Sequence, residues 1–365
     1  PGATNLVTGI ATAQMDSVPL VVVTGQVPRP AIGTDAFQET DIFGITLPIV
    51  KHSWVIRDPS DIAKVVSEAF FIASSGRPGP VLIDIPKDVG QQFFNYKRIL
   101  PGEIIPKGFK RNGEINDCDI KKATKLIEES ERPLLYVGGG AISSNAHDEI
   151  ATLAKNYQIP VTTTLMGKGA FDERDELSVG MLGMHGTAYA NFAVTECDLL
   201  IAIGARFDDR VTGKLDTFAP TAKVIHIDID PAEVNKNRRV DVAIISDVAK
   251  AVCKINETFL KNKNFSKTKN WLEKIDFWKN KHPLFLPPEE GEIYPQEVLI
   301  KVRDYYPEAY ITTDVGQHQM WAAQYLRNSP RKWISSAGLG TMGFGLPAAI
   351  GVKAALPNSQ VICIA

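Results

Sequence analysis

Two glycine-rich segments carry most of the chemistry that this sequence indicates. GQVPRPAIGTDAFQET occupies 25–40, and GLGTMGFGLPAAIG occupies 338–351. Neither has the spacing of a common nucleotide-phosphate loop. Glycine lets the backbone come close to a ligand because it has no side chain. The two segments therefore predict backbone packed closely against a flat cofactor.

A second group of motifs lies in the middle of the chain. LLYVGGGAISSNAHDEI at 134–150 predicts a strand, a glycine turn and a capped helix, which would bring a helix N-terminus to a diphosphate. A simple tight turn at Gly138, Gly139 and Gly140 is the alternative. In GARFDDR at 204–210, Arg206 and Arg210 would lie one helical turn apart if the segment coils, and a surface ion-pair cluster is the alternative.

Acidic residues close this middle group. VIHIDIDPAEV at 224–234 places Asp228 and Asp230 at a strand end, where an acid commonly binds ribose hydroxyls. Ligands of open α/β sheets bind at the carboxyl edge of the strands. Because all three motifs follow successive predicted strands, they predict a dinucleotide site.

Two further motifs lie near the carboxyl end. TDVGQHQMW at 313–321 follows a predicted strand, so the residues after it should face a ligand, although a capped loop histidine is the alternative for His318. GTMGFG at 340–345 has small residues on both sides of Met342, which leaves room for a flexible apolar side chain beside a cofactor. A core methionine between turn glycines is the alternative.

The elements around these motifs indicate the fold. Short apolar runs at 20–23, 81–85, 134–137, 199–203, 224–229, 310–313 and 361–364 alternate with helical stretches, which is typical of parallel α/β sheets. Helical periodicity predicts one helix after Pro295, one capped by Asn116 or Asp117, and one with a buried stripe of Trp271, Ile275 and Trp278. The apolar face of the first is predicted at Val298, Leu299, Val302, Tyr305 and Tyr306, and that of the second at Ile120, Ala123 and Ile127.

Composition restricts the partners. Lys and Arg number 40 against 42 Asp and Glu, so no strong field attracts nucleic acid or an anionic membrane, and a small-molecule substrate is expected. The four cysteines are far apart and encode neither a disulfide framework nor a zinc site, which indicates a reducing compartment. No apolar run approaches the roughly 18–20 residues that span a bilayer. Linkers at 97–116 and 261–283 predict segments of about 1–100, 115–262 and 283–365.

These motifs, with GMLGMHGT and GARFDDRVTG, resemble the acetolactate synthase family of thiamine-diphosphate enzymes from end to end. The resemblance implies three doubly wound parallel-sheet α/β domains, truncated at both ends. They are a pyrimidine-binding domain, a central Rossmann-like FAD-binding domain and the start of a diphosphate-binding domain. It also implies a structural flavin, FAD, that contacts Arg77, Gly138, Gly139, Gly140, Met184, His185, Gly186, Thr187, Gly204, Ala205, Arg206, Asp208, Asp228, Asp230 and Asp247.

The resemblance assigns thiamine diphosphate to the outer segments. It implies cofactor contacts from Val315, Gly316, Gln317, His318 and the Gly340 carbonyl, and a Met342 that holds the bent cofactor. Gln38 would approach the reacting carbon, while Phe37 and Arg210 would select the second 2-oxo acid. Arg210 suits a carboxylate because its planar fork binds both oxygens. Residues expected to line the herbicide-binding substrate channel are Pro28, Ala36, Met184 and Asp209.

The implied activity joins decarboxylated pyruvate to a second pyruvate or to 2-oxobutanoate, in the biosynthesis of valine, leucine and isoleucine. The activating glutamate is expected before Pro1, and Gly-Asp-Gly and the other Mg²⁺ ligands after Ala365, so no metal ligand is assigned within the chain. A homodimer, a regulatory small subunit and a plastid-stroma or bacterial-cytoplasm location are also implied, with no secretion. The alternatives are a related enzyme, such as glyoxylate carboligase, and a non-catalytic nucleotide-binding module.

Overall fold

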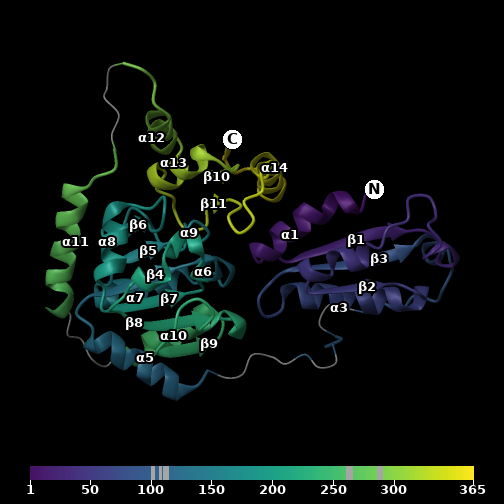
Figure 1. Cartoon of the computed structure of the whole chain (residues 1–365), viewed down its shortest axis with the longest axis horizontal. Coiled ribbons are helices and arrows are strands. Elements are labelled where there is room, and N and C mark those ends of the chain that lie inside the picture. The colour runs from purple at the N-terminus through teal and green to yellow at the C-terminus, as the bar shows by residue number, and fades with distance from the viewer. Residues whose placement is uncertain (100–102, 107–108, 110–114, 260–265, 286–290) are drawn as a thin grey trace. The chain divides into compact units, whose positions relative to one another are not determined.

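The computed structural model describes residues 1–99, 103–106, 109, 115–259, 266–285 and 291–365 (Figure 1). It divides into two compact units, Pro1–Arg111 with Gly338–Thr341, and Asn112–Ala337 with Met342–Ala365. The predicted segment boundaries at 100 and 262 fall outside the described residues, as do parts of both predicted linkers. Within the described part, no helix has both the length and the apolar character needed to cross a membrane.

The first unit contains a parallel sheet in the order β1-β3-β2, formed by Leu20–Gln26, Pro80–Pro86 and His52–Val55 respectively. The middle strand, β3, is apolar and largely buried because helices cover both of its faces. Val81 and Ile83 pack toward α3 (Ile62–Ser74), whereas Leu82 packs toward α1 (Val7–Met15) and α2 (Ile42–Thr46). A short helix, α4 (Lys87–Gly90), follows β3.

The second unit contains a six-stranded parallel sheet in the order β6-β5-β4-β7-β8-β9. Its strands are β4 (Pro133–Val137), β5 (Val161–Thr163), β6 (Ser178–Met181), β7 (Leu199–Ile203), β8 (Lys223–Asp228) and β9 (Val242–Ile245). Alternate side chains of β4 and β7 enter two separate apolar clusters. Helices therefore cover both faces of the sheet, which is the arrangement of a doubly wound fold.

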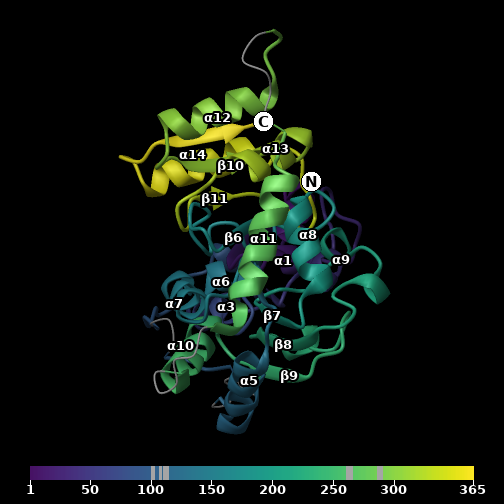
Figure 2. The ribbon, with the colours of Figure 1, turned by 90° about the vertical axis from the view of Figure 1, so that its left-hand side faces the viewer.

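Helices α5 (Asp117–Glu129), α7 (His147–Tyr157) and α10 (Val248–Phe259) contribute to one cluster. Helices α8 (Ala188–Glu196) and α11 (Lys269–Lys281) contribute to the other and lie side by side in both views (Figures 1 and 2). Two predictions are confirmed here. Asn116 caps α5, whose Ile120, Ala123 and Ile127 are buried, and α11 buries Trp271, Ile275 and Trp278.

A third parallel sheet, in the order β11-β10-β12, also belongs to the second unit. Its strands are β10 (Tyr310–Thr313), β11 (Trp333–Ile334) and β12 (Val361–Ile364), and its helices are α12 (Pro295–Tyr305), α13 (Gln317–Tyr325) and α14 (Gly345–Ala355). Three parallel sheets with interleaved helices confirm the predicted α/β fold class.

One helix face was predicted wrongly. Helix α12 begins at Pro295 as expected, but Leu299 is its one fully buried residue, and Val298, Tyr305 and Tyr306 are exposed by 49%, 77% and 46%. The reason is that α12 packs against α13 along a narrow stripe that includes Leu299 and Val302. The periodicity identified the helix, but it overestimated the width of the buried face.

Candidate functional site

The strand order of the central sheet reverses direction between β4 and β7. From β4 the chain adds β5 and β6 on one side, and then returns to place β7, β8 and β9 on the other. The reversal makes β4 and β7 the topological switch point, where open α/β sheets bind ligands beyond the carboxyl ends of the strands. Gly138 follows β4 and Gly204 follows β7, so two predicted motifs meet at this point.

The glycines of these two motifs are required by close backbone packing. A Cβ on Gly138 would collide with the Gly204 carbonyl oxygen and lie 2.7 Å from Ala205 Cα, and one on Gly140 would lie 2.7 Å from Gly204 Cα. The Gly138 amide donates to the Ile203 carbonyl (2.9 Å), and the Gly140 amide donates to the Gly204 carbonyl (3.0 Å). Two of the three amides of the glycine run are therefore hydrogen-bonded within the protein.

The local structure after β4 differs from the prediction. A short helix, α6 (Gly139–Ser143), begins inside the glycine run, and the longer α7 begins at His147 without a side-chain cap. The expected capped helix is therefore replaced by a short helix whose own N-terminus lies at the glycines. It forms there because the backbone contact with Gly204 holds the run in a compact conformation.

The loop after β5 was not predicted as part of the site. Met166 packs beside Gly139, and a Cβ on Gly167 would collide with the Val137 carbonyl oxygen. In the same loop Lys168 and Glu173 form an ion pair with side chains exposed by 2% and 6%. The glycines that flank Lys168 after a short strand were the signal that could have indicated this loop.

Arg206 and Arg210 do not share a helical turn, which corrects the prediction. Helix α9 comprises Asp209–Thr212, and the Asp208 side chain caps it by accepting from the Arg210 amide (3.1 Å). Phe207 has a φ of 54° and turns the chain between the two arginines. Its ring packs at 5.4 Å from that of Tyr136 and 5.2 Å from that of His226, and His226 Nε2 donates to the Ala205 carbonyl (2.9 Å). Aromatic packing therefore fixes the conformation of this loop.

The GMHGT and GARFDDR segments are brought together. The Met184 amide donates to the Arg210 carbonyl (2.9 Å), and Arg210 Nη1 lies 3.8 Å from Met184 Sδ. Arg210 pairs with Asp209 at 3.8 Å, and both side chains are largely exposed. His185 is exposed and lies beside Gly186. Thr187 is buried and caps α8, with its Oγ1 donating to the Val179 carbonyl and accepting from the Ala190 amide.

Acidic residues at the same edge take part in local hydrogen bonds. Asp228 Oδ1 accepts from the Asp230 amide (2.9 Å), and Asp230 Oδ1 accepts from the Ala232 amide (3.0 Å). Asp247 Oδ2 accepts from Ser144 Oγ (2.7 Å), which joins the end of α6 to the start of α10. Asp228 and Asp230 lie at the carboxyl edge of β8, the position predicted for ribose-binding acids, and each also stabilises its own turn.

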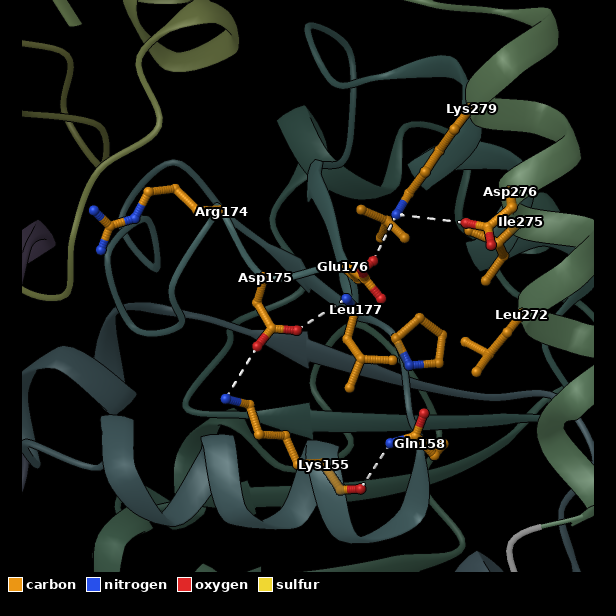
Figure 3. A pocket seen from close by; sticks show the side chains of 12 residues that line it. Lys155, Gln158, Arg174, Asp175, Glu176, Leu177, Leu272, Ile275, Asp276 and Lys279 are labelled. Atoms are coloured by element: carbon orange, nitrogen blue, oxygen red, sulfur yellow. Dashed lines mark hydrogen bonds and ion pairs between the residues drawn. The ribbon is translucent and has the colours of Figure 1, made fainter. Parts of the chain in front are cut away.

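A separate cavity of about 370 Å³ lies at the opposite edge of the central sheet (Figure 3). Its lining includes Pro160 and Leu177, which directly precede β5 and β6, and side chains of α11. Lys155 pairs with Asp175 (3.1 Å), and Lys279 donates to the Glu176 carbonyl (2.7 Å). The cavity therefore lies away from the glycine turns after β4 and β7, and these two lysines are already engaged.

The third sheet presents a loop that is tied to Asp314. The Asp314 carboxylate accepts from the amides of Val315 (2.8 Å), Gly343 (3.0 Å) and Gly345 (3.1 Å). Hydrogen bonds from these amides hold the pKa of Asp314 below its ordinary value, and the bond from Val315 contributes most. Asp314 thus connects the turn after β10 to the GTMGFG segment and keeps it in place while the carboxylate is ionised.

His318 lies in the first turn of α13, directly after Gln317. Among the described residues, its Nε2 is buried and has no hydrogen-bond partner. A Cβ on Gly316 would lie 2.8 Å from His318 Cε1, so the glycine leaves room for the imidazole. A buried nitrogen of this kind needs a partner, and a bound anionic group could provide one.

Met342 is 80% exposed, which excludes the alternative of a core methionine in this structure. Gly343 follows it with a φ of 87°, and Gly340 precedes it with a φ of 69°. In the first unit, the Gly338 amide donates to Asp16 Oδ1 (2.7 Å), and Thr341 Oγ1 lies 2.5 Å from Thr12 Oγ1. Gly338 and Thr341 are therefore anchored within the first unit, and Met342 begins the part of the chain that belongs to the second.

The first unit presents the 27–41 loop after β1. Phe37 is 89% exposed, and Pro28 and Gln38 are also exposed. Ala36 is half-buried. Arg77 lies on the connection before β3, at the opposite end of this sheet, and its Nε donates to Ser17 Oγ (2.9 Å). The structure thus groups Pro28, Phe37 and Gln38 on one loop, whereas Arg77 lies at the other edge of the sheet.

No group of three or more His, Cys, Asp or Glu residues in the described part is placed to hold a metal ion. The four cysteines are free thiols.

Comparison with protein families matches three consecutive parts of the chain. Residues 1–45 match the N-terminal TPP binding domain of thiamine pyrophosphate enzymes, residues 120–255 the central domain, and residues 314–365 the C-terminal TPP binding domain. The three described sheets fall in the same order along the chain.

Individual relatives match over the whole chain. An acetolactate synthase large subunit of Parasynechococcus marenigrum is 70% identical over 365 residues, which are 100% of this chain and 59% of the relative. That of Porphyra purpurea is 60% identical over 368 residues, covering 100% of this chain and 62% of the relative. An acetolactate synthase of Mycobacterium bovis is 50% identical over 375 residues, covering 100% of this chain and 59% of the relative.

The chain spans about three-fifths of the length of these curated relatives. Its matches to the N-terminal, central and C-terminal domain families occur in the order that the sequence resemblance implies. The chain therefore belongs to the thiamine pyrophosphate enzymes, and it is related over its whole length to the acetolactate synthase large subunits.

Proposed function

We propose that this chain forms most of the catalytic subunit of an acetolactate synthase. The enzyme would decarboxylate pyruvate and condense the two-carbon unit with a second pyruvate or with 2-oxobutanoate. The observation that carries the proposal is the 70% identity to an acetolactate synthase large subunit over the whole chain. The Phe37, Arg210 and Met342 side chains agree with it, because each is exposed at the surface, where a ligand can reach it.

The third sheet suits thiamine diphosphate. The unpartnered Nε2 of His318 could donate to a group that offers an acceptor, such as a diphosphate oxygen, and Val315, Gly316 and Gln317 would line the same edge. When bound, thiamine diphosphate supplies an electron sink for the decarboxylation. Met342 would hold the cofactor's shape, and the Gly340 carbonyl would accept from its amino group. The accompanying Mg²⁺ has no assigned ligand in this chain.

The switch point of the central sheet suits FAD in a structural role. The switch point between β4 and β7 gives the diphosphate a place beside the Gly138 and Gly204 turns. Arg206 would neutralise its charge, and Asp228 and Asp230 would bind ribose hydroxyls. Further contacts would come from Arg77, Met184, His185, Gly186, Thr187, Ala205, Asp208 and Asp247, all but Arg77 on the central sheet's loops.

Arg210 and Gln38 are expected to contact the substrate. The guanidinium of Arg210 would bind the carboxylate of the second 2-oxo acid, and Gln38 would lie beside the reacting carbon. We also propose a homodimer with active sites at the subunit interface, because Leu346 and Ile350 on α14 are each 62% exposed. A separate regulatory small subunit and a plastid or bacterial-cytoplasmic location complete the proposal, which agrees with cyanobacterial and algal relatives.

Product analysis tests this function directly. The full-length protein, supplied with thiamine diphosphate, Mg²⁺ and FAD, should form 2-acetolactate from pyruvate and 2-aceto-2-hydroxybutanoate when 2-oxobutanoate is added. A glyoxylate-specific product without acetolactate would favour glyoxylate carboligase. FAD binding without thiamine diphosphate binding in a thermal-shift panel would favour a non-catalytic nucleotide-binding module.

Met342 should act through its volume. Met342→Leu roughly preserves that volume and should retain much of the activity, whereas Met342→Ala should lower turnover at least tenfold, or about 1.4 kcal/mol of transition-state stabilisation. Turnover is measured in the full-length enzyme at saturating cofactors, with a smaller expected change in cofactor affinity. Wild-type turnover in a stable alanine variant would remove Met342 from the site.

Pro28 should control inhibitor binding. Its ring is exposed at the start of the 27–41 loop, with a φ of −53° and a carbonyl that accepts from the Ala31 amide (2.8 Å). Pro28→Ser should weaken sulfonylurea inhibition at least tenfold, or about 1.4 kcal/mol, and largely spare turnover. Dose–response curves of the two forms measure this, and equal inhibition would place Pro28 outside the channel.

A further inference from the structure

The 27–41 loop is anchored at both of its ends. Near its start, the Arg29 amide and Nε donate to the Asp88 carboxylate at 2.9 and 2.7 Å. Near its close, Gln26 Nε2 donates to the Thr40 carbonyl (3.0 Å) and to Asp84 Oδ2 (3.0 Å). The buried Asp84 is also bonded to Thr24 Oγ1 (2.7 Å). The ends of the loop are thus attached to the carboxyl edge of the first sheet.

The middle of the loop is organised around the carboxylate of Glu39. Its Oε1 accepts a short hydrogen bond from the Gly33 amide, and its Oε2 accepts from the Ala36 amide (3.1 Å). Hydrogen bonding by the backbone amides lowers the pKa of Glu39. The Gly33 amide contributes most, and those of Ala36, Thr34 and Asp35 contribute as well. Successive amides that converge on one anion form a nest, here occupied by a side chain of the loop itself.

This arrangement determines how Gln38 and Phe37 are presented. Gln38 has a φ of 63°, in the left-handed region that a residue with a side chain enters at a cost of roughly 1–2 kcal/mol. Asp35 and Gly33 also have positive φ, at 56° and 81°. While Glu39 points inward to the amides, Phe37 remains 89% exposed. The hydrogen bonds of Glu39 therefore offset the backbone strain of the conformation in which Phe37 and Gln38 point outward.

We propose that Glu39 is a positioning residue, whose carboxylate holds the 27–41 loop in the conformation that presents Phe37 and Gln38 to the second 2-oxo acid. The substrate part of this proposal rests on the proposed function. Direct proton transfer is a poor role for Glu39, because its oxygens already accept hydrogen bonds from several amides. Its effect on the reaction is indirect and acts through the loop.

The test compares Glu39→Ala and Glu39→Gln with Asp35→Asn in the full-length enzyme. Asp35 is an exposed carboxylate of the same loop, and asparagine tolerates its left-handed backbone. Hydrogen–deuterium exchange of the 32–38 segment should be at least tenfold faster in Glu39→Ala, and within twofold of wild type in Asp35→Asn. Glu39→Gln keeps one acceptor oxygen and should lie between them.

The second measurement is the ratio of the two acetohydroxy acids formed when pyruvate and 2-oxobutanoate compete. This ratio does not depend on the amount of folded enzyme, so a purely destabilising variant would leave it unchanged. Glu39→Ala should change it at least threefold and lower kcat/KM at least tenfold, with FAD affinity within twofold of wild type.

The outcomes separate the two levels of the proposal. Faster exchange with an altered product ratio supports it. Unchanged exchange overturns it, because the amides would not depend on the carboxylate. Faster exchange with wild-type kinetics overturns the positioning role and leaves the proposed function intact. A wild-type enzyme that forms no acetohydroxy acid overturns both the proposed function and the substrate part of this proposal. Hydrogen–deuterium exchange would then test only whether Glu39 holds the loop conformation.

Discussion

Lys168→Met is expected to lower the free energy of unfolding by about 3–5 kcal/mol, because it leaves a buried carboxylate without its cation. Lys168 Nζ donates to Glu173 Oε1 (2.6 Å) and to the Leu326 carbonyl (2.8 Å). The Lys168 and Glu173 side chains are exposed by only 2% and 6%. Glu173 also accepts from the Asn328 amide (2.9 Å). The pair thus joins the loop after β5 to the loop after α13.

Urea unfolding of the full-length protein measures the loss, and two further variants identify its cause. Lys155→Met removes a comparable pair with Asp175, in which Lys155 is 61% exposed, and should cost no more than about 1 kcal/mol. Lys168→Met combined with Glu173→Gln removes both charges and should recover at least half of the loss. Equal costs for Lys168→Met and Lys155→Met would show that the buried pair is no more important than a surface pair.

The loops at the carboxyl edges could be predicted from the sequence, because a glycine run directly after a short apolar strand is typical of a turn that approaches a ligand or another backbone closely. Gly138 and Gly204 lie directly after β4 and β7, as the motifs indicated. The order of the strands could not be predicted in the same way. It depends on pairings such as that of Leu135 with Ile201, which are far apart in the chain, and local patterns contain no information about them.

Short strands were the main omission from the predicted fold. β5 comprises only Val161–Thr163 and β2 only His52–Val55, and neither is a purely apolar run. β5 is buried by the strands and helices around it and not because of its own composition, whereas only Ser53 of β2 is fully buried. Pairing with neighbouring strands therefore makes these segments strands: β5 pairs with β4 and β6, and β2 pairs with β3.

Features that depend on tertiary contacts also could not be predicted from the sequence. The separation of Arg206 from Arg210 follows from the left-handed Phe207, which is held by the distant rings of Tyr136 and His226. The burial of Lys168 also depends on distant contacts and could not be predicted, because a lysine five residues before a glutamate is usually a surface residue. Residue types indicated the chemistry of the site, and long-range packing determined its geometry.

Gly138→Ala should destabilise the protein by about 3 kcal/mol and weaken FAD binding at least tenfold. The added Cβ would meet the Gly204 carbonyl and Ala205 Cα, which are backbone atoms and cannot rotate away. To make room, the turns after β4 and β7 would have to separate, and the hydrogen bond from the Gly138 amide to the Ile203 carbonyl (2.9 Å) would lengthen. The change therefore acts on the crevice proposed for the flavin diphosphate.

Urea unfolding and a flavin-fluorescence titration of the full-length protein measure the two effects separately. Gly90→Ala is the matched control, because the nearest atom of the described residues beyond its own helix would be Ile85 Cγ2, at 4.0 Å from the new Cβ, and both measurements should stay near wild type. A destabilised variant that still binds FAD normally would show that Gly138 serves packing alone and that the flavin lies elsewhere. Wild-type values for both would show that the two turns can separate without cost, which would contradict the close backbone contact on which the proposed crevice depends.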